Sequence, residues 1–330
     1  MRALLWVVLG FGVLWGGYWW LGSTALERGA EAWFVNAQAQ GLVAERDSMA
    51  VRGFPNRFDL TVNGLHLADP ATGWGWDAPF AQLFAMTWKP WHLIAALPPS
   101  QVITTPLEKV TLTSTRMMGS LVLHPGTDLA LNRMVVEGEG LVALSDLGWT
   151  VGVEKLVAST SEDPSRRFSH RVGLNVTRLT PDAAVSGLLP DLPGVVDLIQ
   201  LDAYALLTAP LDRHAGKTLP QLTGIELDAL EIRWGGLWLS AKGSVAVASE
   251  GFAEGRIDIR VENWRHLPPV LAALGLVKPE VAPTIERALE IMARGSLDPQ
   301  VLDLPLIFKS GRMSLGLLPL GPAPKLAQRQ

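Results

Sequence analysis

The first part of the chain is a long run of apolar residues, and the pattern then changes to a helical one and finally to an alternating one. No charged side chain occurs from Ala3 to Leu26, and Arg2 precedes this run. As a helix, residues 3–21 would extend about 28 Å, close to the thickness of the hydrocarbon layer of a membrane. The pattern therefore predicts a transmembrane anchor over residues 1–24 that meets the lipid bilayer through residues 3–21.

The residues that flank this run predict its orientation. Arg2 lies before it, and charges of both signs follow it from position 27 onward. This order favours a cytoplasmic amino terminus and places the bulk of the chain outside the cytoplasm, while the Tyr-Trp-Trp sequence at 18–20 suits the headgroup interface. The alternative is a cleaved signal peptide with Ser23 and Ala25 as its small cleavage residues. The length and the tryptophan content of the run favour an uncleaved anchor.

A helical period continues beyond the anchor. Apolar residues recur at helical spacing, at Leu26, Ala30, Trp33 and Ala37. This spacing predicts a stalk helix over residues 25–48, with Gly41 as its weakest point. A straight stalk of this length would extend about 37 Å, and Arg52 and Arg57 would then lie tens of ångströms from the bilayer.

Beyond the stalk, apolar and polar residues alternate with the period of a β-strand. Clear examples are Phe58-Leu60-Val62, Val172-Leu174-Val176 and Ile257-Ile259-Val261. Turn sequences rich in Gly, Pro and Asp separate the alternating segments. The alternation changes phase at Gly64 and again across Ala229, which predicts bulges or tight bends at these two positions.

Together these patterns predict a mainly β (α+β) protein. We expect a transmembrane helix and a stalk helix, followed by a long, twisted, bent antiparallel sheet, groove-like or open and barrel-like, with a few short helices. The first β-rich unit is expected over residues 49–160 and the second over residues 161–330. Two apolar stripes at helical spacing predict a helical hairpin near residues 266–294 in the second unit.

Composition excludes several classes of function. The formal net charge is -4 and the pI is about 5.9, whereas binding of nucleic acid calls for a basic surface. The chain has no cysteine, which excludes disulfides and thiolate metal sites, and its six histidines do not pair at metal-ligand spacing. Nucleotide-binding loops and a nucleophile elbow are absent from the sequence. We therefore expect no cofactor, no metal and no enzyme activity, because a hydrolase would need a nucleophile and a base to converge from distant positions.

Aromatic residues beside glycine, proline or arginine are the candidate ligand-binding positions. They gather in RGFPNRFDL (52–60), MTWKPW (86–91) and IRWGGLWL (232–239). Large aromatics on sheets usually pack in the core, and the alternative is a lining for an acyl chain or another apolar ligand. Arginines beside them are candidates for contact with a phosphate headgroup. The candidate ligand-binding residues are Trp91, Trp88, Phe54, Phe58, Trp234, Trp238, Arg52 and Arg57.

The two tryptophans at 88 and 91 are expected to differ in burial. Trp88 continues the apolar face of Phe84 and Met86, so the alternation predicts a mostly buried side chain. Pro90 has no amide hydrogen to donate to a sheet, so the strand is expected to stop or to lie at an edge there. Trp91 is then expected nearer the rim of the sheet.

Two segments carry a resemblance to known families. The anchor, the stalk and Gly53-Phe54-Pro55 followed by Arg57 and an alternating strand, with the later PFAQL run, are similar to the bacterial family called domain of unknown function 2125. That family has no established activity and no catalytic residues. The closing region LPLIFKSGRMSLGLLPLGPAP (304–324) resembles the end of AsmA-like proteins, which are membrane-anchored envelope proteins with long twisted sheets implicated in handling lipid between membranes. This chain is much shorter than the members thought to bridge two membranes.

The resemblance implies a location and a kind of work. We expect a single-pass protein of the bacterial inner membrane whose periplasmic β-rich domain binds a phospholipid or another apolar ligand. The alternative is a non-catalytic scaffold or accessory subunit of a cell-envelope complex, with a protein partner. An open apolar trough would favour the first hypothesis, and a filled, dry sheet interior would favour the second.

Overall fold

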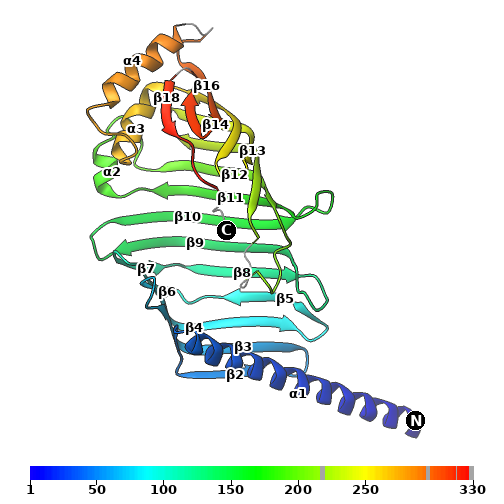
Figure 1. Ribbon diagram of the computed structural model, residues 1–330. Helices are drawn as coiled ribbons and strands as arrows, with labels where there is room; N and C mark the ends of the chain where they lie inside the picture. Colours follow the sequence, from blue (N-terminus) through cyan, green and yellow to red (C-terminus); the bar gives the residue numbers. More distant parts are fainter. Residues whose placement is uncertain (216–219, 295–297, 317, 327–330) are drawn as a thin grey trace. The chain divides into compact units, whose positions relative to one another are not determined.

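The computed structural model describes residues 1–215, 220–294, 298–316 and 318–326 (Figure 1). The chain forms two compact units: unit 1 comprises Met1–Pro125 and Val136–Gly148, and unit 2 comprises Gly126–Val135 and Trp149–Gln330. Antiparallel strands make up most of both units, and the helices outside the amino-terminal one are short. The mainly β class with a long amino-terminal helix and a few short helices is therefore confirmed.

The amino-terminal helix α1 (Arg2–Ala39) combines the predicted anchor with most of the predicted stalk. It is long and apolar enough to cross a membrane. The prediction that the helix continues to residue 48 is wrong, because Gly41 adopts a φ of 87° and turns the chain. Strands β1 (Val43–Glu45) and β2 (Ser48–Arg52) then run back along the helix.

Unit 1 is a branched antiparallel sheet in which a long strand faces two shorter ones. Its further strands are β3 (Arg57–Asp69), β4 (Trp74–Met86), β5 (Lys89–Ala96), β6 (Ser100–Thr104), β7 (Lys109–Thr113), β8 (Arg116–Leu123) and the later part of β9 (Leu131–Ser145). β3 pairs with β1 and β2 along one edge and with β4 along the other. β4 pairs in turn with β5 and with β6. One branch continues from β5 to β8, and the other continues from β6 through β7 to β9.

The core of unit 1 lies between α1 and this sheet. Phe34 and Ala37 of the helix are buried against Leu60, Val62 and Leu65 of β3. The helical stripe predicted from the sequence therefore faces the sheet, with Phe34 in place of the exposed Trp33. Burial of this apolar surface holds the helix on the sheet.

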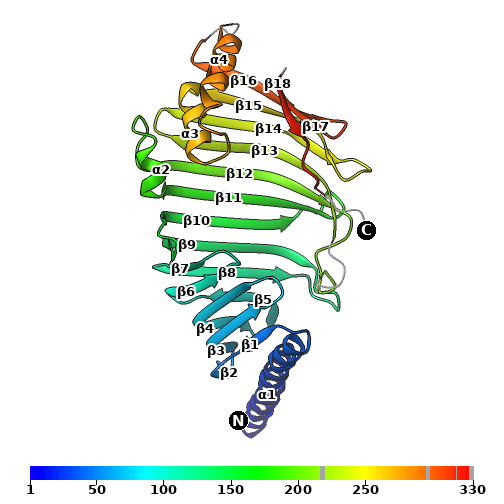
Figure 2. The ribbon, with the colours of Figure 1, turned by 60° about the vertical axis from the view of Figure 1, so that its left-hand side comes forward.

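Unit 2 is a meander in which each strand pairs with the next. Its strands are β10 (Thr150–Glu162), β11 (Ser169–Thr180), β12 (Val196–Leu207), β13 (Leu222–Trp234), β14 (Leu237–Val247), β15 (Ala253–Glu262), β16 (Val301–Lys309), β17 (Arg312–Leu315) and β18 (Leu318–Pro322). The pairings run in order from β10 to β18 (Figure 2). No connection needs to cross the sheet, since adjacent strands are antiparallel.

Short helices cover one end of the unit 2 sheet. They are α2 (Ala183–Gly187), the 3-10 turn η1 (Trp264–His266), α3 (Leu267–Ala273) and α4 (Ala282–Ala293) (Figure 2). The structure thus has two helices, α3 and α4, in the region of the predicted hairpin. Trp264 and Leu289 from these segments are buried with Val261, Leu302 and Leu304 of the strands.

The two predicted bends have different structures. β13 shifts register between Leu227 and Leu230, so the bulge predicted across Ala229 is confirmed. At Gly64 the pairing of β3 with β4 stays in register, so no bulge forms there. Gly64 instead adopts a φ of 59°, which an L side chain rarely takes. This residue turns the strand so that Val62 and Leu65, three positions apart, both enter the core.

Candidate functional site

One end of unit 1 combines two tight connections that the sequence had singled out. The corner at residues 52–57 joins β2 to β3, and the turn at residues 86–89 joins β4 to β5. The amide nitrogen and the hydroxyl of Thr87 both donate to the carbonyl of Asn56, at 3.1 and 3.2 Å. Thr87 is fully buried by this contact. We call residues 52–57 and 86–89 the aromatic edge.

Three aromatic side chains of α1 bind this edge. Trp15 Nε1 donates to the Pro55 carbonyl at 3.0 Å, and Trp19 Nε1 donates to the Arg57 carbonyl at 2.7 Å. The Tyr18 hydroxyl donates to the Thr87 carbonyl at 2.6 Å. Each donor is thus matched by a backbone carbonyl of the aromatic edge.

Ring packing adds to these hydrogen bonds. The Phe54 ring meets Trp19 edge to face, with 5.4 Å between the centroids. Phe58 is buried and stacks beside Trp19, and its ring lies so close to Gly22 that a Cβ there would come within 2.5 Å of Phe58 Cζ. Residues 15–19 of α1 are therefore fitted to the aromatic edge, and Gly22 is fitted to the adjoining Phe58. The expectation that a stalk separates Arg52 and Arg57 from the apolar run is wrong, because the chain reverses at Gly41.

The aromatic edge also carries cations. Arg52, Arg57 and Lys89 are exposed. Arg57 pairs with Asp59 at 2.8 Å, whereas Arg52 and Lys89 form no ion pair among the residues that the structure describes. The edge and its one neighbouring carboxylate therefore carry more positive than negative charge.

The burial predicted for the two neighbouring tryptophans is reversed. Trp88 is 57% exposed, and Trp91 is half-buried on β5. The alternation through Phe84 and Met86 stops because Met86 pairs with Lys89, which leaves Thr87 and Trp88 at the tip of a tight hairpin. The small Thr87 takes the buried position and Trp88 points outward.

The remaining predicted site residues belong to unit 2. Trp234 is buried in the core, where its Nε1 donates to the Pro193 carbonyl at 2.6 Å. Trp238 is partly exposed and pairs across the sheet with Arg233, whose guanidinium lies 5.7 Å from its ring centroid. Since Trp234 and Arg233 alternate along β13, the two tryptophans lie on opposite faces of the sheet and form no common site.

The meander of unit 2 has one apolar face. Residues directly opposite each other in neighbouring strands share a face, and on this face they are apolar from β10 to β16. One row runs through Ala158, Leu174, Leu201, Leu230, Ala241, Ile259 and Leu304. Leu174, Leu201 and Leu230 are half-buried and lie between the core under the helices and a second core near Phe308.

The other face of the same sheet is charged. Arg171 pairs with Asp202, Arg256 pairs with Asp258 at 2.6 Å, and Arg260 lies 3.1 Å from Asp303. The hydrogen bond from Arg171 lowers the pKa of the Asp202 carboxyl. The pair with Arg171 favours the ionised form of Asp202, and the charged side chains of this face suit contact with water.

A buried histidine lies at the end of the apolar face. His170 of β11 is buried, with its Nδ1 3.4 Å from the Thr160 hydroxyl. Burial lowers the pKa of the His170 imidazole, against the smaller opposing effect of the Glu162 charge. The neutral form is therefore favoured in the folded protein.

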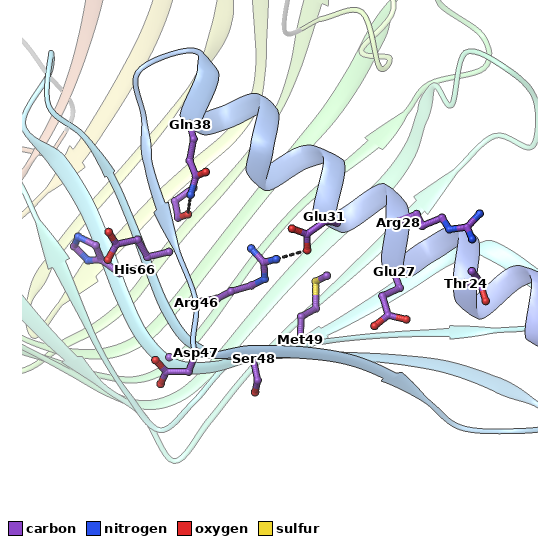
Figure 3. A pocket seen from close by; sticks show the side chains of 13 residues that line it. Thr24, Glu27, Arg28, Glu31, Gln38, Arg46, Asp47, Ser48, Met49 and His66 are labelled. Carbon is purple, nitrogen blue, oxygen red and sulfur yellow. Dashed lines mark hydrogen bonds and ion pairs between the residues drawn. The ribbon is translucent and has the colours of Figure 1, made fainter.

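Unit 1 also holds two grooves at its helix. A polar groove of about 780 Å³ lies between α1 and the β1–β2 segment (Figure 3). Glu31 and Arg46 form an ion pair across it, and His66 lies at 2.5 Å from Asp77 at its margin. The described residues include no group of three or more His, Asp or Glu arranged to hold a metal. A smaller apolar groove of about 450 Å³ includes the exposed Trp33 and Trp74.

Sequence reasoning missed the residues of α1 that complete the aromatic edge. Trp15, Tyr18 and Trp19 had been assigned wholly to the membrane or its interface, because hydropathy does not tell a lipid contact from a protein contact. The available signal was the pairing of an aromatic-rich helix with an aromatic-rich corner 35 residues further along. The two segments meet only because the chain reverses at Gly41, and the sequence did not show this reversal.

A helix long and apolar enough to cross a membrane, joined directly to antiparallel sheet, defines a β-rich protein with a candidate membrane anchor. The chain belongs to the bacterial family described as "Uncharacterized protein conserved in bacteria (DUF2125)", whose model matches residues 19–324. That match covers both units and begins within the part of α1 that binds the aromatic edge. None of the curated proteins and none of the solved structures matches the chain.

Proposed function

We propose that this protein is a non-enzymatic, single-pass protein of the bacterial inner membrane that binds a phospholipid or another apolar ligand on the apolar face of unit 2. In this proposal α1 is the anchor, the amino terminus is cytoplasmic and both units lie in the periplasm. The proposal agrees with the resemblance of the closing region to AsmA-like proteins.

The observation that carries the proposal is the row of apolar partners across the sheet. A solvated sheet face is ordinarily polar, and a face in a core is ordinarily covered along its whole length. Here Leu174, Leu201 and Leu230 stay half-buried between two covered ends. Such a stretch gains free energy when an apolar molecule replaces water on it, at about 25 cal/mol per Å² of apolar surface.

The dimensions suit an acyl chain. Seven strands at about 4.8 Å spacing give a face about 29 Å across. Half of the hydrocarbon thickness of a bilayer, which is the reach of one lipid tail, is about 15 Å. The charged opposite face, with its Arg171–Asp202 and Arg256–Asp258 pairs, supports a binding surface on one side of the sheet only.

Site-specific photo-crosslinking in the full-length protein tests this proposal. A photoreactive amino acid would replace Leu201 in one protein and its neighbour Gln200 in another. The two positions are adjacent on β12 and lie on opposite faces, so they differ in the face sampled and little else. After irradiation in cells, mass spectrometry would identify what is attached.

We expect lipid adducts at Leu201 and none at Gln200. Lipid at neither position would overturn the proposal. A single protein attached reproducibly at Leu201 would instead support the alternative, a scaffold or accessory subunit of an envelope complex.

A further inference from the structure

We propose that the aromatic edge of unit 1 is a second membrane contact, seated at the outer boundary between hydrocarbon and headgroups of the same bilayer that α1 crosses. It is independent of ligand binding by unit 2, and it concerns residues 52–57 and 86–89 alone. Its partner is the phospholipid surface around the helix.

The length of α1 sets the depth of the edge in the bilayer. α1 is exposed on all sides over residues 3–14, and unit 1 begins to touch it at Trp15. Twelve helical residues extend about 18 Å, whereas the hydrocarbon layer is about 30 Å thick. A bilayer spanned by this helix must therefore reach to about residue 21 or 22. The aromatic edge and the adjoining Phe58 are bound to residues 15–22, so they extend from the outer boundary of the hydrocarbon to about 10 Å below it.

The composition of the edge suits a membrane interface. Phe54 is 62% exposed, and Met86 and Trp88 of the neighbouring turn are exposed as well. Exposed large apolar side chains on neighbouring turns are costly in water and favourable at a membrane interface, where Trp in particular is enriched. Arg52 and Lys89 supply positive charge at the same end, which suits lipid phosphates.

The hydrogen bonds between α1 and the edge suit the same environment. In a medium poor in water, each polar group must find a partner within the protein. The donors of Trp15, Tyr18 and Trp19 are all matched by carbonyls of the edge. All three donors thus have partners within the protein, as a contact that lies partly in the membrane requires.

Position-specific labelling tests the proposal, and the absence of cysteine from the chain makes it direct. Trp88→Cys, Trp74→Cys and Leu14→Cys would each be labelled with a fluorophore in the full-length protein in nanodiscs. The bilayer would contain phosphatidylcholine and phosphatidylglycerol with quenchers attached near the headgroup and, in a parallel sample, on the acyl chain. Trp88 and Trp74 form a matched pair, because they are 57% and 55% exposed and lie at opposite ends of β4, about 40 Å apart.

We expect strong quenching at position 88, quenching at the intramembrane position 14, and none at position 74. Quenching at 14 without quenching at 88 would overturn the proposal. Quenching at all three would also overturn it, since unit 1 would then lie flat on the surface. If Trp88→Cys does not fold, as judged by circular dichroism, Lys89→Cys on the same turn takes its place.

A second comparison tests the role of the cations. With phosphatidylcholine alone, quenching at position 88 should decrease relative to the mixture. The Arg52→Gln/Lys89→Gln protein should remove that difference. Equal quenching in both bilayers would overturn the assignment of these cations to anionic headgroups. Failure of lipid crosslinking at Leu201 leaves these outcomes unchanged, so the two proposals fail separately.

Discussion

Units 1 and 2 are both antiparallel sheets with one apolar face, and they differ in what covers that face. In unit 1 a single helix, α1, lies along the sheet and buries Phe34 and Ala37 against β3. In unit 2 three short helices and the closing strands cover the two ends, and the middle row around Leu201 stays half-buried. One helix thus covers the sheet of unit 1, whereas the coverings of unit 2 leave the middle of its apolar face half-buried.

The largest effect is expected when the helix contact of unit 1 is removed. Phe34→Ala deletes a side chain that is 4% exposed, and it should destabilise unit 1 by about 3–5 kcal/mol because a cavity remains. Chemical denaturation of the protein in detergent, followed by proteolysis, would measure this change. Trp33→Ala is the control, since Trp33 precedes it on the helix and is 51% exposed. A similar loss for both would mean that helix formation, and not packing, is disturbed.

A smaller effect is expected where the helix meets the aromatic edge. Gly22→Ala forces a methyl group against the Phe58 ring and should cost about 1–3 kcal/mol through overpacking. Gly17→Ala, one and a half turns away, meets no atom within 4 Å among the described residues and should be neutral or slightly stabilising. Thermal unfolding of both proteins would test the pair. Equal melting temperatures would show that the contact between Gly22 and Phe58 contributes nothing.

Unit 2 should respond to pH through His170. Its pKa is lowered by burial in the folded state, so the unfolded chain binds the proton more readily. Stability is therefore full above the unfolded pKa of about 6.5 and decreases as the pH falls below it. In His170→Gln this decrease between pH 6.5 and pH 4.5 should be smaller. A denaturation series over that range measures it, and parallel curves for both proteins would contradict the assignment.

The smallest stability effect is expected at Trp88. Because this side chain is exposed at a hairpin tip, Trp88→Ala should change the free energy of unfolding in detergent by no more than about 0.5 kcal/mol. The alternation of the sequence had predicted a buried residue and a loss of about 3–5 kcal/mol. Detergent denaturation of the variant separates the two expectations directly.

The sequence predicts whether a segment is a helix or a strand better than it predicts which strands pair. Alternation at Phe58-Leu60-Val62 and at Ile257-Ile259-Val261 correctly indicated strands, because one face of each strand is buried. It could not show that β3 pairs with both β1 and β2, since these contacts depend on where the chain reverses. The reversal follows from Gly41, which looked only like a weak point in a helix.

The candidate site shows the same limit. Arg52, Phe54, Arg57 and Phe58 were found from their local sequence, and the structure brings them together at one edge with Trp88. Trp234 was selected by the same rule, yet it fills a core and satisfies the Pro193 carbonyl. Local composition does not tell an exposed aromatic from a buried one when a two-residue turn, as at Thr87 and Trp88, changes the phase.

The continuity of α1 has a mechanical consequence. No flexible linker separates the segment that suits a membrane from the segment that is packed on β3, so the helix acts as a lever arm for unit 1. From Leu21 to Ala39 the arm is about 27 Å long. Transmembrane helices tilt by about 20° to fit the local bilayer thickness, and such a tilt would displace the far end of the arm sideways by about 9 Å. A change in bilayer thickness would thus be converted into a rotation of unit 1.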